Sequence, residues 1–337
     1  MSRQPKARPS FAALVQAYFA EHLTQQRALS PCTVAAYRDA FVLFLGFAES
    51  RLGKSPAAML LADITPELIM AFLDHLERQR HNSVCSRNAR LAALRSFLKF
   101  AAHRDVSSLQ AIERALGVPV KRFERPMFGY LSREEMLAVI GMPDGTWIGQ
   151  RDYVLFLLLY NTGARVSEIT GIKVGEAVLD DGAACVHLHG KGRKQRSVPL
   201  WRSSVKAVRA WLRRNPQFDA TSPLLPNRYG HAMTRNNVSQ RLALAVEAAT
   251  DTNPDLAKRR ISPHTIRHTT AMHLLQAGVD ISVIALWLGH ENPTTTHHYV
   301  EADLTMKERA LARLQEPEAK IQRYRAPDSL IDFLKTL

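Results

Sequence analysis

Residues 117–130 read GVPVKRFERPMFGY and interrupt a sequence whose apolar residues otherwise follow a helical period. This stretch contains two prolines, two glycines and four charged residues with no regular periodicity, which is typical of an extended linker between domains. The chain has 337 residues, enough for two domains with separate cores at roughly 100–200 residues each. We therefore expect a first domain at 1–116, a linker at 117–130, a second domain at 131–316 and a tail at 317–337.

On the N-terminal side of the linker, four helices are predicted, each opened by a hydroxyl side chain that can cap it. Two of these caps are followed directly by proline, which is favoured at the first position of a helix. Apolar residues then recur at the spacing of a helix that buries one face. Short connections between the helices favour a small bundle. The four cap residues are Ser10, Ser30, Thr65 and Ser83.

On the C-terminal side, Ser132 and Glu135 form the S-x-x-E pattern of a capping box, which marks the start of the second domain. Residues 183–189 and 195–200 alternate between apolar and polar types and predict two strands joined by a turn at 190–193. The predicted fold class is therefore mainly α with a small β-hairpin in the second domain (α+β). Further helices are expected near 203–214, 235–250, 264–277, 281–288 and 303–314.

The charge of the chain indicates a polyanionic partner. Lys and Arg number 45 against 31 Asp and Glu, which gives a formal net charge of +14 and a pI of about 10.0. Nucleic acid or an acidic membrane surface fits this charge, and a solvated cationic surface with no partner is the alternative. Basic residues are in excess on both sides of the linker, so one partner could contact both domains.

Composition excludes several classes of protein. A hydrophobic content of 46% and a charged content of 23% are ordinary for a globular chain and argue against disorder. Cys32, Cys85 and Cys185 have no paired spacing, which argues against a disulfide framework or a zinc ribbon and favours a reducing compartment. No secretory signal is recognisable, and the longest apolar run, Tyr153–Tyr160, is too short to span a membrane. We expect a cytoplasmic protein with no membrane partner.

Four short stretches carry residues suited to chemistry, and each also has an ordinary structural explanation. An Arg–Glu pair is most often a surface ion pair, a lysine in a glycine turn is usually solvated, and a tyrosine after threonines is most often a core residue. His264 and His268 lie one helical turn apart, but the glutamate of an H-E-x-x-H zinc helix is missing, so no metal is expected. The stretches are TGARVSE (162–168), GKG (190–192), PHTIRH (263–268) and LGHENPTTTHHY (288–299).

Together, the two arginines, two histidines, lysine and tyrosine of these stretches suit phosphoryl transfer without a metal. Two guanidiniums can neutralise the non-bridging oxygens of a phosphodiester, which Mg²⁺ does elsewhere. A tyrosine hydroxyl can act as the nucleophile, but its free pKa is about 10, so ionising it at pH 7 requires about 4 kcal/mol from a nearby base and cations. A lysine on a hairpin turn can protonate the departing 5′ oxygen.

The order Arg, Lys, His-x-x-Arg, His and Tyr, with these flanking residues, resembles the tyrosine recombinase (phage integrase) family over nearly the whole chain, at a size similar to the Xer recombinases. The resemblance implies an N-terminal four-helix SAM-like core-binding domain, a tyrosine-recombinase catalytic domain and a C-terminal helix. It further implies site-specific DNA recombination through a 3′-phosphotyrosyl intermediate, with no metal, ATP or other cofactor.

The resemblance also implies a role for each matching residue. Two arginines would bind the scissile phosphate, a lysine would protonate the 5′ oxygen, one histidine would assist proton transfer at the tyrosine, and another would hydrogen-bond the phosphate. Tyr299 would be the nucleophile, and Glu168 would support the site from behind. Arg165 and Arg267 would be the two phosphate-binding arginines, and Lys191 would be the proton donor. His264 would assist proton transfer at the tyrosine, and His290 would hydrogen-bond the phosphate.

Tyr299 is preferred among the eight tyrosines because it follows the Leu-Gly-His stretch at the distance typical of the family. His297 and His298 precede it where an apolar residue is commoner, and either supply a proton acceptor or reflect local packing, the explanation we favour. The run HHYVEADL (297–304) is similar to recombinases of transposons and other mobile elements. Integration, excision or transposition of such an element is therefore the expected role.

Double-stranded DNA with a specific recombination site is the expected partner. Strand exchange joins two duplexes, so a homo- or hetero-tetramer is expected, with the tail helix around 330–334 docked on a neighbouring protomer; packing on its own protomer is the alternative. Because about ten residues precede the first predicted helix in this sequence, we expect no separate arm-binding domain. For the candidate contacts on the fourth helix, a solvated face is an equal alternative. The candidate DNA contacts are Arg87, Arg90, Arg95, Lys99 and Arg193.

Two rival functions remain open. A type IB topoisomerase uses similar chemistry, but relaxes DNA as a monomer without a target sequence, and the tail helix and the size of the chain argue against it. A DNA-binding regulatory module without catalysis is the other, and the complete catalytic set argues against that.

Overall fold

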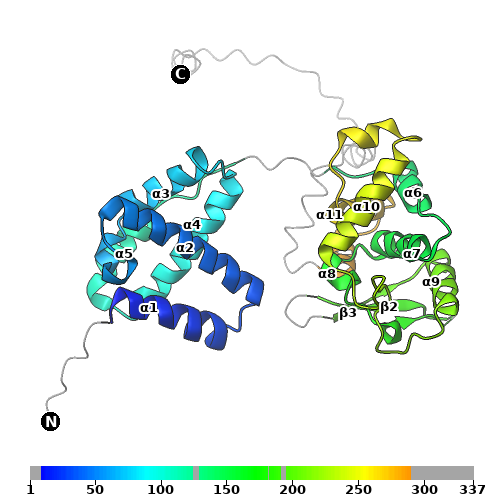
Figure 1. Cartoon of the computed structure of the whole chain (residues 1–337), viewed down its shortest axis with the longest axis horizontal. Coiled ribbons are helices and arrows are strands. Elements are labelled where there is room, and N and C mark those ends of the chain that lie inside the picture. Colours follow the sequence, from blue (N-terminus) through cyan, green and yellow to red (C-terminus); the bar gives the residue numbers. More distant parts are fainter. Residues whose placement is uncertain (1–8, 124–128, 181, 191–194, 290–337) are drawn as a thin grey trace, which may run out of the picture. The chain divides into compact units, whose positions relative to one another are not determined.

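The chain folds as two units, each with its own hydrophobic core (Figure 1). The division lies between residues 126 and 127, inside the stretch that the sequence predicts as a linker. Helices dominate both units and one small sheet accompanies them, so the predicted fold class is confirmed. The structure, a computed structural model, describes residues 9–123, 129–180, 182–190 and 195–289.

The N-terminal unit is a helical bundle in which all four predicted caps are confirmed. Each cap hydroxyl accepts a hydrogen bond from the backbone N–H three residues further on. The short α5 adds to the four predicted helices, and its eight residues bury only Ile112 and Ala115, too few for a clear period. The helices are α1 (Phe11–Ala17), continued by the π-helix η1 (Tyr18–Gln26), α2 (Pro31–Leu52), α3 (Pro66–Arg78), α4 (Val84–Ala102) and α5 (Leu109–Leu116).

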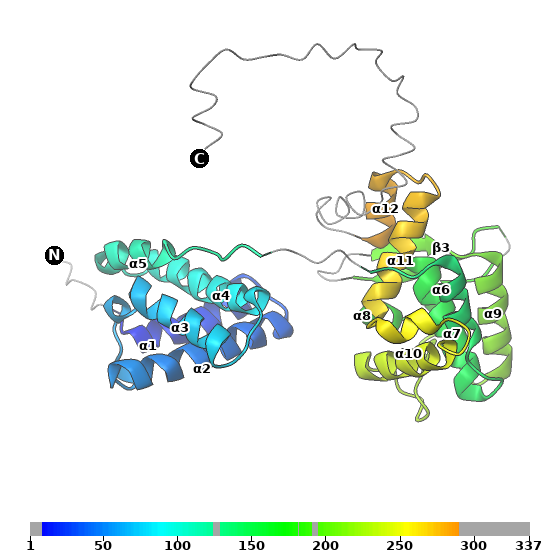
Figure 2. The same ribbon diagram turned by 90° about the horizontal axis from the view of Figure 1, so that it is seen from above.

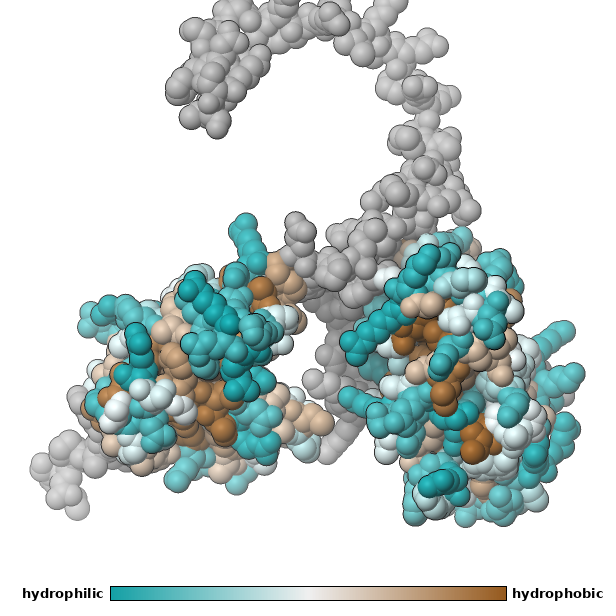
Figure 3. Space-filling model, turned by 45° about the horizontal axis from the view of Figure 1, so that its top comes forward, coloured by the Kyte–Doolittle hydropathy of each residue, from teal (hydrophilic) through white to brown (hydrophobic). Residues whose placement is uncertain are grey.

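Aromatic rings fill the core of this unit. The rings of Tyr18, Phe41 and Phe97 meet with centroids 5.3 to 6.1 Å apart. Among the described residues, α2 is the one helix long and apolar enough to cross a membrane by length and composition, and its Phe41 and Phe44 are buried in this core. The face of each unit visible in Figure 3 carries mostly hydrophilic side chains between separate apolar patches.

The first residues of the predicted linker are fixed to the N-terminal unit. Val118 is buried, and Arg95 donates hydrogen bonds to the carbonyls of Leu116 and Val118. The side-chain amide of Asn88 donates to the carbonyl of Lys121 at 2.8 Å, and its oxygen accepts from the Lys121 backbone N–H at 3.2 Å. Burial of an apolar side chain and pairing of backbone groups therefore hold this segment down to residue 121.

The C-terminal unit packs its helices around α7, with a small sheet at one side (Figure 1 and Figure 2). α7 contacts α6, α8, α9 and α11, and is buried along nearly its whole length. The predicted capping box of Ser132 and Glu135 is confirmed at the start of α6. The helices are α6 (Arg133–Gly141), α7 (Trp147–Thr162), α8 (Val166–Ile169), α9 (Arg202–Arg214), α10 (Arg235–Ala249), α11 (Pro263–Gln276) and α12 (Ile281–Leu288).

The sheet has three antiparallel strands in the order β1 (Ala177–Val178), β2 (Cys185–His189) and β3 (Gln195–Pro199). β2 and β3 confirm the predicted strands, and the two-residue β1 extends them. In the register of the pair, Leu188 lies opposite Arg196. Residues 191–193 of the predicted turn, the predicted helix at 303–314 and the predicted tail helix lie outside the described residues.

Candidate active site

The turn after α7 brings the first predicted arginine into position. Gly163 ends α7 with a φ of 59°, and a Cβ there would lie 2.5 Å from a methyl carbon of Leu288, so both conformation and space require glycine. The hydroxyl of Thr162 closes the turn by accepting the backbone N–H of Ala164 at 3.1 Å. The chain then enters α8 with Arg165 at its N-cap.

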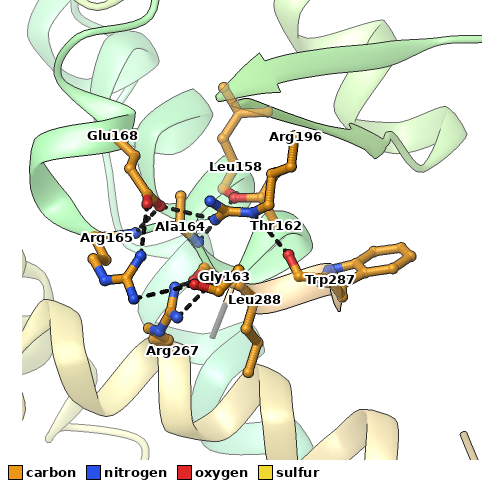
Figure 4. Close-up of polar contacts among 11 residues, drawn as sticks. Leu158, Thr162, Gly163, Ala164, Arg165, Glu168, Arg196, Arg267, Trp287 and Leu288 are labelled. Carbon is orange, nitrogen blue, oxygen red and sulfur yellow. Dashed lines mark hydrogen bonds and ion pairs between the residues drawn. The ribbon is translucent and has the colours of Figure 1, made fainter. Parts of the chain in front are cut away.

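Glu168 holds Arg165 from two directions (Figure 4). The backbone N–H of Arg165 donates to Oε2 of Glu168 at 2.8 Å, and Nη1 of its guanidinium donates to Oε1 at 2.8 Å. The Arg165 side chain is 39% exposed, whereas that of Glu168 is 2% exposed. The pair is therefore more than a surface ion pair: a buried carboxylate orients a guanidinium that keeps an open side.

Arg196 of β3 joins this pair and was not predicted from the sequence. Its Nη2 donates to Oε2 of Glu168 at 2.8 Å, and its Nε donates to the carbonyl of Trp287 at 2.9 Å. A signal for it exists in the sequence. Arg196 and Val198 occupy alternate positions of one strand and so share a face, and Val198 is buried. A charged residue on the apolar face of a strand is unusual unless it is paired.

The ionised state of Glu168 is strongly favoured. Burial alone would raise its pKa, but the hydrogen bond from Arg196, the bond from the Arg165 backbone and the charge of Arg196 lower the pKa to about 2. At neutral pH the site therefore contains a permanent buried anion that fixes two guanidiniums.

The second predicted arginine lies on α11, which begins as predicted at the cap Ser262. Arg267 is 2% exposed; its Nη1 donates to the carbonyl of Gly163 and its Nη2 to the carbonyl of Leu288, both at 2.7 Å. The guanidinium therefore ties the end of α7 to the end of α12 and lies beside the Arg165–Glu168 pair (Figure 4).

His264 lies one turn before Arg267 on the same helix. Its ring meets that of His268 edge-on, with centroids 4.3 Å apart. Burial and the charges of Arg267 and Arg165 lower the pKa of His264 below its usual value of 6.5. The ring is therefore neutral at pH 7 and can accept a proton, which is the state a general base requires.

Three arginines converge on the C-terminal end of α12. The last carbonyls of a helix have no partner within the helix, and cations are favoured there. Gly289 ends α12 with a φ of 66°, and the chain continues to residue 290 from within this arginine cluster. The pairs are Arg196 Nε to Trp287 O (2.9 Å), Arg267 Nη2 to Leu288 O (2.7 Å) and Arg165 Nη2 to Gly289 O (3.3 Å).

The structure thus brings together Arg165, Glu168, His264 and Arg267 from two separate stretches of sequence, and adds Arg196 from a third part of the chain. The other predicted members lie outside the described residues. Among the described residues, no group of three His, Cys, Asp or Glu side chains is placed to hold a metal ion. The members that lie outside are Lys191, Arg193, His290 and Tyr299, together with His297 and His298.

The arginines predicted as DNA contacts on α4 are largely engaged within their own unit. Arg87 is 3% exposed and donates to the carbonyl of Pro119, so its expected place on an exposed face is wrong. Arg95 holds the carbonyls that end α5, and Arg90 donates to the carbonyl of Ala36 at 3.2 Å. Lys99, by contrast, is exposed.

Comparison with family profiles gives two matches that follow each other along the chain. Residues 16–105 match the profile described as the N-terminal SAM-like domain of phage integrases. Residues 130–306 match the profile described as the phage integrase family. The second match alone covers more than half of the chain and includes every described residue of the site.

Curated relatives match over nearly their full length. A Sinorhizobium fredii protein named as an integrase/recombinase, y4rC, is 43% identical over 97% of this chain and 98% of its own. The tyrosine recombinase XerC of Pelobacter propionicus is 33% identical over 89% of this chain and 96% of its own.

Solved structures share the fold at low sequence identity. The XerH site-specific recombinase, solved in a post-cleavage complex with palindromic difH substrate, superposes with a TM-score of 0.66 at 18% identity, covering 89% of this chain and 85% of that one. The Tn1549 transposon integrase, solved with circular intermediate DNA, gives a TM-score of 0.69 at 15% identity, covering 89% and 99%.

Proposed function

The chain belongs to the phage integrase family and is a tyrosine recombinase, and from this premise we propose that it cuts and rejoins DNA at a specific site through a 3′-phosphotyrosyl intermediate. One observation carries the proposal: the open guanidinium of Arg165 lies with Arg267 and a neutral His264 at the point where the chain continues towards Tyr299. The XerH and Tn1549 proteins, which share the fold, were solved on DNA.

The proposed reaction starts at the scissile phosphodiester. Arg165 and Arg267 neutralise its non-bridging oxygens, and their charge stabilises the pentavalent transition state. The Tyr299 oxygen attacks phosphorus and loses its proton with help from His264, while the bond from phosphorus to the 5′ oxygen breaks. Lys191 gives that oxygen its proton, and His290 hydrogen-bonds the phosphate. These roles follow from the family and from the basic, partly desolvated surroundings of the described residues.

The energy of the broken bond is kept in the phosphotyrosyl link. A 5′ hydroxyl from a second duplex then attacks this link, and the same residues act in reverse. Because two guanidiniums supply the positive charge that a divalent cation supplies elsewhere, we propose that neither metal nor ATP takes part.

Exchange between two duplexes requires four protomers, with the tail helix as the proposed contact between them. Identity to the integrase/recombinase y4rC along nearly the whole chain, together with the likeness to a transposon integrase, supports integration, excision or transposition of a mobile element as the role. A DNA substrate places the protein with the nucleoid in the cytoplasm.

The test uses labelled DNA from the flanks of the gene, with nicks that trap the cleaved intermediate. Wild type should give an SDS-resistant protein–DNA band without metal, and adding EDTA should leave that band unchanged. Tyr299→Phe should bind the same DNA and give no band. A band from Tyr299→Phe would assign the nucleophile to another tyrosine, and relaxation of plasmids without any target sequence would favour a topoisomerase.

A further inference from the structure

Arg196 makes contacts that the predicted catalytic set does not explain. Resting on the proposed function, we propose that Arg196 is a positioning residue: it fixes the paired strands β2 and β3, between which Lys191 stands in the sequence, against the phosphate-binding arginines, and thereby sets the delivery of a proton to the departing 5′ oxygen.

The placement of Arg196 on its strand supports this role. It lies opposite Leu188, which is fully buried, and its own side chain is only 13% exposed. An arginine directed to the buried side of a strand is stable only if its charge and N–H groups are paired. Arg196 is therefore held in one place by its partners.

Its two partners come from two other elements. Nη2 donates to Glu168 of α8, and Nε donates to the carbonyl of Trp287 at the end of α12. A Cβ added to Gly289 would lie 2.9 Å from Nη1 of Arg196, so the guanidinium also lies close against the residue that ends α12. The planar guanidinium of Arg196 thus connects β3 to the Glu168 carboxylate and to the end of α12. A lysine ammonium on a flexible stem does not reproduce this geometry.

The hydrogen bonds that hold the phosphate-binding arginines do not run through Arg196. Arg165 has its own two hydrogen bonds to Glu168, and Arg267 has the carbonyls of Gly163 and Leu288. What is lost is the link between β3 and the rest of the site. Since Lys191 stands five residues before Arg196 in the sequence, between the two paired strands, the defect is expected in proton delivery rather than in phosphate binding.

A substrate with sulfur at the 5′-bridging position separates these two effects. In the normal reaction the electron pair of the broken bond goes to the 5′ oxygen, which must take a proton from Lys191. A thiol has a pKa of about 8.5 and leaves as the thiolate, whereas water has a pKa of about 15.7 and a 5′ alkoxide is a similarly poor leaving group. Sulfur therefore removes the need for the general acid.

The experiment measures single-turnover cleavage at saturating DNA with the full chain, on nicked oxygen and sulfur substrates. Arg196→Gln is expected to be about 10- to 100-fold slow on oxygen DNA, as for a small misplacement of a catalytic group, and within a few-fold of wild type on sulfur DNA. Lys191→Ala should show the same rescue, and Arg267→Ala should stay slow on both substrates. Arg213→Gln, the same change at an exposed position of α9, should match wild type.

Equal slowing of Arg196→Gln on both substrates, or a wild-type rate on oxygen DNA, would overturn the inference. If Arg196→Gln fails to fold, Arg196→Lys replaces it in the test, because lysine keeps the positive charge beside Glu168 but lacks the planar guanidinium. The same rescue by the sulfur substrate is expected. Failure of wild type to form an adduct with either substrate would overturn the proposed function itself. If wild type cleaves but sulfur does not rescue Lys191→Ala, the general acid lies elsewhere and the inference fails with that assignment.

Discussion

Two groups of arginines in the described part of the chain, one on α4 and one around the end of α12, donate hydrogen bonds to carbonyls near a helix end. Arg95 holds the end of α5, as Arg267 holds the end of α12. The regions differ in what surrounds the guanidiniums. Around α12, a buried carboxylate orients Arg165, whose side chain stays 39% exposed, and a neutral histidine stands beside it. Donating hydrogen bonds to backbone carbonyls is therefore a structural role on its own. The candidate active site differs by having a guanidinium that a carboxylate orients and that stays partly exposed.

The largest effect is expected when the partly exposed guanidinium of Arg165 is removed. Arg165→Ala should reduce cleavage by about 10²- to 10³-fold, the typical loss when one donor to a transition-state charge is removed. DNA affinity and the tryptophan-reported unfolding transition should change little, because Arg267 keeps its own contacts to Gly163 and Leu288. Single-turnover adduct formation measures the loss. Near-normal cleavage would place Arg165 outside the reaction.

The same comparison shows what sequence reasoning reaches. Arg165, His264 and Arg267 were identified because the motifs around them resemble those of a known family, and local pattern placed these motifs at or near helix starts. Arg196 was missed because its partners Glu168 and Trp287 are 28 and 91 residues away, and no local period reports such contacts. The expectation for Arg87 failed for a related reason.

A polar stripe on α4 looked solvated, but the chain returns over it and places the carbonyl of Pro119 within reach of Arg87. The predicted caps succeeded because a cap is settled within three residues. Contacts made by a returning chain depend on tertiary packing and so cannot be read from a helical pattern alone.

Protonating Glu168 should lower the unfolding free energy of the C-terminal unit as the pH falls from 4.5 towards 2. Its pKa is about 2 in the folded chain against an ordinary 4.5, so the unfolded chain binds the proton more tightly. The stabilisation is complete above pH 4.5 and is lost as the pH falls towards 2. Between pH 6 and pH 3 the advantage of wild type over Glu168→Gln in unfolding free energy should shrink by about 2 kcal/mol.

Urea unfolding followed by tryptophan fluorescence measures this effect, since all four tryptophans lie in the C-terminal unit. A difference between the two proteins that does not vary with pH would mean that the carboxylate is not the buried anion of the site. Glu176→Gln, which removes a carboxylate of the same unit whose side chain is 22% exposed, provides the comparison.

On the other side of the comparison, Arg95→Met should affect stability but not chemistry. It removes hydrogen bonds to the carbonyls of Leu116 and Val118, which should destabilise the N-terminal unit by about 1–3 kcal/mol. Faster amide hydrogen exchange at residues 109–121 would report the loss. Cleavage at saturating DNA should stay at the wild-type rate, and slow cleavage in a stable Arg95→Met protein would return Arg95 to the DNA contacts.

The smallest effect is expected at Lys99, the exposed basic residue of the α4 set. If it neutralises one phosphate, Lys99→Gln should weaken DNA binding a few-fold and make the plot of log affinity against log salt shallower by about 0.9. Lys54→Gln is the matched control, because Lys54 is also an exposed lysine of this unit but is paired with Asp63 at 2.9 Å. An unchanged slope in both variants would confine the DNA contacts of this unit to other residues. A changed slope in Lys99→Gln alone would show that α4 contacts DNA through this exposed lysine while its arginines serve the fold.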